Sequence, residues 1–367
     1  MEDLVTSLEN TYRGRRVFVT GHTGFKGAWL CEWLLALGAE VAGFSLAPPT
    51  APSLFDQLGL SGRLRHQIGD VRNEAELREE ILSFRPDFVF HLAAQSLVRA
   101  SYTLPVDTFA VNVLGTAHLL ESVRHLDGLC AVVVITTDKC YKNSETGRAF
   151  LETDPLGGHD PYSSSKAAAE LVVESYRTSF FSKPDSRIAL ASARAGNVIG
   201  GGDWALDRIV PDAMRALAKG LPVPVRNPNA VRPFQHVLEP LGAYLLLGAA
   251  LAQGDLAVRS AFNFGPEQES HRSVESLVTE ILKHWDGEWQ NTAQPGALHE
   301  AHLLHLCIDK ARQMLAWQPV WAFEEAIRQT VAWYNYASDP AADLPSFTQS
   351  QIAAYQSAAT YSRRDRL

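Results

Sequence analysis

Tyr162 and Lys166 stand four residues apart in the run Pro161-Tyr-Ser-Ser-Ser-Lys, which leads into a segment of helical composition. Residues at this spacing share one face of a helix. An ammonium group beside a phenol lowers the phenol pKa, so that the phenolate can accept a proton near neutral pH. The pair therefore predicts acid–base catalysis, although the same pattern also occurs on ordinary surface helices.

A second polar group follows the apolar run at residues 131–136. Thr137, Asp138 and Lys139 stand in succession within Thr-Thr-Asp-Lys-Cys-Tyr at 136–141. Ligands of open α/β sheets bind at the carboxyl ends of the strands, so these side chains are expected at a ligand site. The alternative is a structural cluster that caps the strand and forms a salt bridge.

A glycine-rich turn directly follows the first apolar run. Gly21, Gly24 and Gly27 have the spacing G-x-x-G-x-x-G. Such glycines allow a tight turn and bring the backbone close to a pyrophosphate at a helix N-terminus, so the turn predicts a dinucleotide site. The next expected strand ends at Ser45, with neither an acid for a ribose 2′-hydroxyl nor an arginine for a 2′-phosphate. These residues therefore leave NAD and NADP both open.

The elements that must position these groups alternate between strands and helices. Continuous apolar runs predict strands buried on both faces, at residues 16–20, 41–45, 87–92, 131–136 and 188–194. Helical patterns lie between them, including residues 28–37 and 111–126. This alternation predicts a doubly wound α/β fold with a parallel sheet.

The composition changes after about residue 195, where glycines and prolines become frequent. We expect a dinucleotide-binding domain over 1–190 and a smaller, loop-rich substrate-binding region over 191–340, with segments that can return to the first domain. The tail over 341–367 is polar with scattered aromatic residues, and we expect it to be only partly ordered.

Composition and charge exclude several classes of protein. The 367 residues carry 33 basic and 41 acidic side chains, a net charge of −8. This charge disfavours non-specific electrostatic binding to nucleic acid or to an anionic membrane. The four cysteines form no C-x-x-C pattern, so neither a disulfide framework nor a metal site is indicated. The acidic N-terminal residues do not resemble a signal peptide, and we expect a cytoplasmic protein.

Longer motifs give a specific resemblance. They are Val-Thr-Gly-His-Thr-Gly-Phe-Lys-Gly at 19–27, Thr-Thr-Asp-Lys-Cys-Tyr at 136–141, Asp-Pro-Tyr-Ser-Ser-Ser-Lys at 160–166, Ala-Arg-Ala-Gly-Asn-Val-Ile-Gly-Gly-Gly-Asp-Trp at 193–204 and Val-Arg-Pro-Phe-Gln-His-Val at 231–237. Through them the chain resembles the extended short-chain dehydrogenase/reductase superfamily and, within it, the CDP-glucose 4,6-dehydratase family. The similarity runs from about residue 10 to about residue 340.

The resemblance implies a Rossmann-type sheet with a smaller C-terminal α/β domain, NAD as cofactor and CDP-glucose as substrate. Tyr162, assisted by Lys166 and Thr137, would take the proton of the sugar 4-hydroxyl while hydride leaves C4 for NAD. Elimination of water across C5 and C6 and return of hydride to C6 would give CDP-4-keto-6-deoxyglucose. Asp138 would be the acid for the 6-hydroxyl. Related dTDP-glucose dehydratases place a glutamate where this chain has Lys139, so Lys139 is expected either as the C5 base or as a stabiliser of the enolate.

The resemblance also implies binding residues and an assembly. The expected cofactor contacts, beside Tyr162 and Lys166, are Gly21, Thr23, Gly24, Phe25, Lys26, Gly27, Asp70, Val71, Leu92, Ala93 and Ala94. The expected substrate contacts are Gln95, Ser96, Arg99, Asn197, Trp204, Arg208 and Arg232. Lys26 and His22 are candidates for the cofactor phosphates, and Trp204 can stack on the base or belong to the core. A homodimer is expected through a four-helix bundle built from helices at about 105–125 and 163–180.

Two other functions fit part of these motifs. A sugar-nucleotide 4-epimerase needs the same turn and the same Tyr162–Lys166 pair, but it does not need titratable groups at Asp138 and Lys139. A dinucleotide-sensing protein without turnover has no reason to keep Thr137 together with that pair.

Overall fold

The computed structural model describes residues 4–143, 147–183, 186–293 and 304–364. Its centre is a seven-stranded sheet with the order β11-β6-β5-β4-β1-β2-β3, and neighbouring strands are parallel throughout. The strands are β1 (Arg16–Thr20), β2 (Glu40–Ser45), β3 (Arg65–Ile68), β4 (Phe88–His91), β5 (Cys130–Ile135), β6 (Ile188–Ala195) and β11 (Ala261–Phe264). The predicted doubly wound Rossmann-type sheet is confirmed.

The order of the strands reverses between β1 and β4. From β1 the chain runs outward through β2 and β3, and β4 then returns to the other side of β1. The pairing of Thr20 with both Phe44 and His91 aligns the carboxyl ends of these strands at one edge of the sheet. In open α/β sheets such a reversal opens a crevice for a ligand at this edge.

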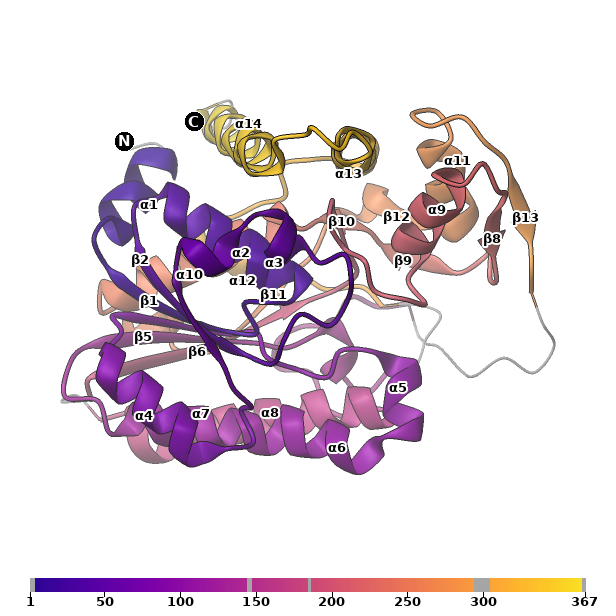
Figure 1. Cartoon of the computed structure of the whole chain (residues 1–367). Helices are drawn as coiled ribbons and strands as arrows, with labels where there is room; N and C mark the ends of the chain where they lie inside the picture. Colours follow the sequence, from indigo (N-terminus) through magenta and orange to yellow (C-terminus); the bar gives the residue numbers. More distant parts are fainter. Residues whose placement is uncertain (1–3, 144–146, 184–185, 294–303, 365–367) are drawn as a thin grey trace.

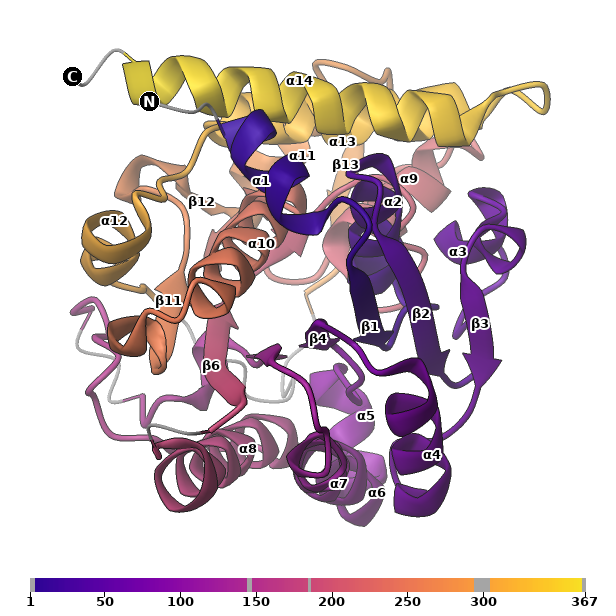
Figure 2. The ribbon, with the colours of Figure 1, turned by 90° about the vertical axis from the view of Figure 1, so that its left-hand side faces the viewer.

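Helices cover both faces of the sheet (Figures 1 and 2). One face carries α2 (Phe25–Ala36) and α10 (Leu238–Ala252), and the other carries α4 (Glu74–Phe84), α7 (Gly115–Arg124) and α8 (Pro161–Tyr176). Alternate strand residues enter the two layers: Val17 and Val19 pack with the first set of helices, whereas Phe18 packs with the second. This alternation explains why the strands read as continuous apolar runs, because both faces are buried.

Short elements connect these layers. Further helices are α1 (Leu4–Tyr12), α3 (Leu54–Gln57), α5 (Val98–Thr103), α6 (Pro105–Phe109) and α12 (Asp309–Leu315). Four short segments are 3-10 helices: η1 (Leu60–Gly62), η3 (Asp138–Cys140), η5 (Leu256–Val258) and η6 (Gln268–Ser270). Two are π-helical: η2 (Ala110–Leu114) and η4 (Arg177–Phe181). Within the described ranges, none of the helices combines the length and the apolar character needed to cross a bilayer.

The C-terminal part forms a smaller lobe beside the sheet, at the upper right of Figure 1. It contains α9 (Ile209–Leu217) and α11 (Val274–Ile281). Its strands pair in twos: β7 (Val198–Ile199) with β10 (Gln235–His236), β9 (Val231–Pro233) with β12 (His271–Ser273), and β8 (Val223–Val225) with β13 (Trp289–Asn291). Between these pairs the chain goes back to the large sheet through α10 and β11, so the sequence beyond residue 190 contributes to both lobes.

The C-terminal tail is helical, which corrects the expectation of a partly ordered segment. Helix α13 (Phe323–Ala337) is followed by α14 (Leu344–Arg364), which lies across the top of Figure 2. Its buried residues Leu344, Ile352 and Tyr355 recur at helical spacing. Tyr355 donates a hydrogen bond of 2.9 Å to the Glu239 carboxylate on α10. The serine, threonine and glutamine residues between these positions hide the apolar face in the sequence.

Candidate active site

A cleft of about 1470 Å³ opens at the carboxyl ends of the central strands, and both lobes contribute to its wall. Five of the predicted catalytic side chains line it: Thr137, Asp138, Lys139, Tyr162 and Lys166. The structure therefore brings together groups that are up to 29 positions apart in the sequence.

The glycine-rich turn connects β1 to α2 in a conformation that requires glycine. Gly21 has φ +76°, and a Cβ atom there would lie 2.7 Å from the backbone nitrogen of Ala93. A Cβ on Gly27 would lie 2.1 Å from the Gly21 carbonyl oxygen. Gly24 precedes α2, and no side chain caps that helix. The first backbone N–H groups of α2 are thus available to an anion, as a pyrophosphate site requires.

His22 and Thr23 point away from the position expected for phosphates. The His22 ring is buried over Gly43, and its Nε2 atom lies 2.7 Å from Nδ1 of His66. Burial, together with His66, lowers the pKa of His22 to about 3. Thr23 contacts the Ser45 hydroxyl at 2.9 Å. Both residues tie the turn to β2 and β3, so the expected contact of His22 with the cofactor phosphates is not what the structure shows.

Lys26 is the charged residue of the turn that reaches the cleft, together with Phe25. Its ammonium group donates a hydrogen bond of 3.0 Å to the Tyr244 hydroxyl. Burial, with smaller contributions from Lys166 and Arg208, lowers the pKa of Lys26 to about 7. A cluster of cations faces this part of the cleft, which suits an anionic ligand.

The segment after β5 presents an acid that is almost entirely shielded from water. Thr137 donates a hydrogen bond of 2.9 Å to Oδ1 of Asp138. Asp138 is 1% exposed, and its Oδ2 atom has no hydrogen-bond partner among the described residues. A Cβ atom on Gly196 would lie 2.8 Å from that oxygen, so glycine leaves room beside it. Nζ of Lys139 lies 3.9 Å from Oδ1 of Asp138.

Tyr162 lies in the first turn of α8, which Asp160 caps by accepting a hydrogen bond from the Ser163 N–H. Burial raises the pKa of Tyr162 to about 12, and a hydrogen bond with Thr137 opposes part of that shift. Burial thus outweighs the hydrogen bond from Thr137, and the expected lowering of the Tyr162 pKa by Lys166 stays a prediction. The Lys166 ammonium donates to the Ile135 carbonyl oxygen at 3.2 Å.

The loop after β4 was expected to serve both cofactor and substrate. Leu92, Ala94, Ser96 and Arg99 line the cleft. Ala93 donates its backbone N–H to the Thr20 hydroxyl at 3.2 Å. The Gln95 amide donates to the Leu97 carbonyl oxygen and the Thr108 hydroxyl, within its own loop and toward α6. The expectation that Gln95 faces the sugar is corrected, because its side chain is consumed by local hydrogen bonds.

Arginines gather on the C-terminal side of the cleft. Arg208 pairs with Asp203 at 2.9 Å and donates to Ser96 at 3.3 Å, and Arg232 and Asn197 also line the wall. Arg226 is a further member that sequence reasoning missed, since it lies in no recognisable motif; it pairs with Asp207 at 2.6 Å.

Trp204 does not line this cleft. Its Nε1 atom donates to the Gln57 amide oxygen at 2.8 Å, and its ring meets Tyr334 edge-on with centroids 5.2 Å apart. The ring is partly buried against the main core. Of the two roles considered for Trp204, the structure supports the core residue and not the base-stacking one.

Asp70 and Val71 lie beyond the part of the cleft described above. Asp70 forms an ion pair of 2.6 Å with Arg72, which lowers the pKa of Asp70. Val71 is buried against Gly115. Their predicted contacts with the adenosine half of the cofactor stay predictions.

Comparisons with known proteins agree with this architecture. The model of the family described as GDP-mannose 4,6 dehydratase matches residues 18–330. A curated CDP-glucose 4,6-dehydratase from Salmonella typhimurium is 44% identical over 357 residues, which is 96% of this chain and 99% of that protein. The chain belongs to the family of sugar-nucleotide 4,6-dehydratases that this model describes. The predicted membership of the extended short-chain dehydrogenase/reductase superfamily and of its CDP-glucose 4,6-dehydratase family is confirmed.

Solved structures place this dehydratase family member among related sugar-nucleotide enzymes. The UDP-glucose 4-epimerase of Thermus thermophilus, solved in complex with NAD, is 28% identical with a TM-score of 0.73, and the match covers 88% of this chain and 99% of the epimerase. A dTDP-glucose 4,6-dehydratase from Bacillus anthracis shares the fold, with a TM-score of 0.72 at 21% identity and coverage of 88% and 97%.

Proposed function

We propose that this enzyme converts CDP-glucose into CDP-4-keto-6-deoxyglucose with NAD as a cofactor that is regenerated in each turnover. The observation that carries the proposal is Asp138, a buried carboxylate in the cleft with one oxygen that has no partner among the described residues. The chain that presents it is 44% identical to a CDP-glucose 4,6-dehydratase. A 4-epimerase has no proton to deliver to a departing hydroxyl, whereas a dehydratase needs such an acid.

The residues at the crevice between β1 and β4, where the strand order reverses, fit NAD. Gly21 lets the turn pack against the backbone of Ala93, and Gly24 precedes the uncapped N-terminus of α2, where a pyrophosphate would bind. When bound, NAD would supply the acceptor that takes the hydride from C4 of the sugar and returns it at C6. Ser45 offers no carboxylate to the ribose, so we expect NAD to be lost during gel filtration; a stoichiometric cofactor in the purified protein would contradict this.

The proton transfers fall to three side chains of the cleft. Tyr162, in contact with Thr137, would accept the proton of the 4-hydroxyl. Asp138 would give a proton to the departing 6-hydroxyl, because its side chain lines the cleft and its Oδ2 atom has no hydrogen-bond partner among the described residues. Lys139, which lines the same wall, would take the C5 proton or stabilise the resulting enolate.

Lys139→Ala separates these two roles. A base is required for any exchange of the C5 proton with solvent deuterium, whereas an electrostatic stabiliser is not. Intact C5 exchange in the variant would exclude Lys139 as the base.

The anionic part of the substrate would bind on the C-terminal side, over residues 191–340. Arg208 and Arg232 line that wall, and guanidinium groups match pyrophosphate oxygens in a forked geometry. Arg208 is held by Asp203 at 2.9 Å, which fixes its orientation. An acidic protein can thereby hold an anionic nucleotide through a local basic wall.

We also propose a homodimer. Large apolar side chains are exposed on the outer helices: Val106 on α6 is 81% exposed, Leu114 on η2 is 54% exposed and Leu171 on α8 is 59% exposed. Light scattering should show twice the monomer mass, and Leu171→Lys should shift it toward the monomer. Leu256→Lys, at a position 67% exposed outside these helices, is the matched control. A wild-type monomer would refute the dimer.

A cytoplasmic location is the corresponding proposal for the cell. It is supported by the free cysteines, of which Cys31, Cys130 and Cys140 are buried and unpaired. Such thiols are typical of proteins from reducing compartments.

Incubation with CDP-glucose and NAD tests the proposed activity. The expected product is a 4-keto-6-deoxy sugar that absorbs in alkali and whose mass is lower by one water. Conversion to CDP-galactose instead would establish the epimerase. Tyr162→Phe should bind NAD but lose activity by about 10²–10⁴-fold, because it lacks the oxygen that would accept the proton of the 4-hydroxyl; an active Tyr162→Phe would contradict the assigned role.

A further inference from the structure

Beneath the cleft lies a buried ion pair between Glu170, which lies outside the motifs, and Arg194 of the motif at 193–204. Glu170 and Arg194 are 3% and 4% exposed, and their closest charged atoms are 2.8 Å apart. The carboxylate also accepts a hydrogen bond of 2.5 Å from the Thr136 hydroxyl and one of 2.8 Å from the Ser192 hydroxyl. Neither member of the pair lines the cleft, so any effect on the reaction must pass through the residues that they hold.

Glu170 attaches the beginning of the catalytic segment to α8. It stands one helical turn beyond Lys166 and therefore on the same face of α8. Lys166 bonds the carbonyl of Ile135, and Glu170 bonds the side chain of the next residue, Thr136. The residue after that is Thr137, which contacts both Tyr162 and Asp138.

Arg194 on β6 holds the other end of the same segment, at Tyr141. Its guanidinium donates to the Tyr141 hydroxyl at 2.7 Å and lies over the Tyr141 ring at 5.0 Å. Tyr141 in turn donates to the Asn263 side chain at 2.6 Å. The segment 136–141, which carries the predicted acid and base, is thus held at both ends by one ion pair.

The pair also affects the charge of Lys166. Burial lowers the pKa of Lys166 to about 8, and the Glu170 carboxylate opposes this shift. The other titratable groups that interact with Lys166 are Cys140 after β5, Lys26 on α2 and His91 on β4. None of these three groups is a carboxylate, and Glu170 is the carboxylate that stabilises the Lys166 ammonium.

We infer that Glu170 and Arg194 are positioning residues of the reaction: together they orient Thr137 and Asp138 and stabilise the Lys166 ammonium. The part that concerns catalysis rests on the proposed dehydratase function. The coupling between Glu170 and Lys166 does not, because it can be measured without turnover.

Glu170→Gln keeps the size of the side chain and removes its charge. Lys166 should then lose its proton at lower pH, by about one unit, which corresponds to about a tenfold change in its protonation equilibrium. Competitive acetylation followed by mass spectrometry measures this titration directly, whatever the substrate. The alkaline limb of kcat with CDP-glucose should move in the same direction, while KM changes less than about twofold.

Glu32→Gln is the matched control for charge. Glu32 is likewise buried and pairs with Arg63 at 2.6 Å, but it lies outside the cleft. This variant should lose stability without moving the Lys166 titration. An unchanged Lys166 titration in folded Glu170→Gln overturns the charge coupling even if CDP-glucose proves not to be the substrate.

Two hydroxyl deletions test the positioning without touching the ion pair. Thr136→Val and Ser192→Ala each remove one donor to the same carboxylate, but only Thr136 belongs to the segment 136–141. Thr136→Val should lower kcat by about tenfold or more, and Ser192→Ala by less than about threefold. Equal effects of the two variants overturn the positioning role, and this comparison decides the question if Glu170→Gln fails to fold.

Discussion

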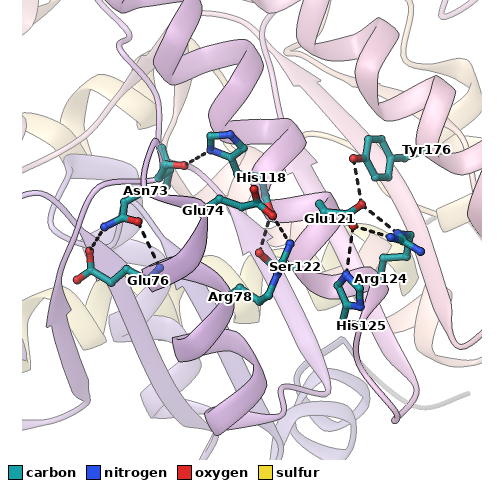
Figure 3. Close-up of polar contacts among 11 residues, drawn as sticks. Asn73, Glu74, Glu76, Arg78, His118, Glu121, Ser122, Arg124, His125 and Tyr176 are labelled. Carbon is teal, nitrogen blue, oxygen red and sulfur yellow. Dashed lines mark hydrogen bonds and ion pairs between the residues drawn. The ribbon is translucent and has the colours of Figure 1, made fainter.

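Two glutamates on the neighbouring helices α8 and α7 lie in different environments. Glu170 is buried beneath the cleft and pairs with Arg194. Glu121 lies on the outer surface of α7, where Arg124, His125 and Tyr176 surround it (Figure 3). The pair of Glu74 and Arg78 on the adjacent helix α4 extends this outer cluster.

The two ion pairs differ in their exposure to solvent rather than in the number of their contacts. The Glu121 and Arg124 side chains are 25% and 39% exposed, so water and salt screen their attraction, and such pairs contribute about 0.2–1 kcal/mol. Loss of one partner of a buried pair costs about 3–5 kcal/mol, because the remaining charge stays out of water. The buried pair thus holds the catalytic segment in place, whereas the outer cluster contributes little to stability.

Asp138→Asn addresses the largest expected effect on activity. In the unmodified protein, Oδ2 of Asp138 has no partner among the described residues, whereas both carboxylate oxygens of Glu170 accept hydrogen bonds. Turnover should fall by about 10²–10⁴-fold, since the acid for the 6-hydroxyl is removed. The free energy of unfolding should stay the same or rise, because a buried oxygen without a hydrogen-bond partner among the described residues is replaced by a neutral amide. A variant that is both active and destabilised would reverse this assignment.

Arg194→Met should have the largest effect on stability. It leaves the Glu170 carboxylate buried without its counter-ion, and the free energy of unfolding should fall by about 3–5 kcal/mol. Chemical denaturation measures the change. Arg124→Met on the outer cluster is the control and should cost less than about 1 kcal/mol. Similar losses in the two variants would remove the contrast between the regions.

Trp204→Phe tests a residue of intermediate burial. It removes the hydrogen bond to Gln57 and part of the contact with Tyr334, and it should lower the free energy of unfolding by about 1–2 kcal/mol. KM for CDP-glucose should not change, because the ring does not line the cleft. A KM raised severalfold with unchanged stability would restore the base-stacking role.

Glu121→Gln should have the smallest effect, and that effect should depend on pH and salt. Hydrogen bonds from Arg124, with a smaller contribution from His125, lower the pKa of Glu121 to about 2, against 4.5 for an ordinary glutamate. The stabilisation by Glu121 is therefore present above about pH 4.5 and is lost as the pH falls toward 2. Unfolding curves of wild type and variant should converge at low pH and in 1 M salt, at which the Debye length is about 3 Å. A difference that persists in high salt would show that the outer cluster behaves like a buried one.

The sequence was sufficient for the features that depend on neighbouring residues. The glycine turn, the Tyr162–Lys166 spacing and the segment after β5 are local patterns, and the structure brings all of them to one cleft. The apolar strands likewise indicated a parallel sheet, because burial on both faces leaves a continuous signature.

Features that depend on distant partners were not predictable in this way. Gln95 and Trp204 have side chains that suit a ligand, but Thr108 and Tyr334, from other segments, occupy them. Glu170 and Arg194 meet only because α8 packs against β6. The raised pKa of Tyr162 was also not predictable from the sequence, because it is caused mainly by burial.

The fate of the hydrogen at C4 of the sugar tests the central claim most directly. CDP-glucose carrying deuterium at C4 should yield a 4-keto-6-deoxy product with deuterium in the C6 methyl group, detected by mass spectrometry and NMR. The deuterium moves because the hydride taken from C4 returns at C6 within one turnover. Deuterium that remains at C4 in a product epimerised at that carbon would contradict the assignment of this chain as a 4,6-dehydratase.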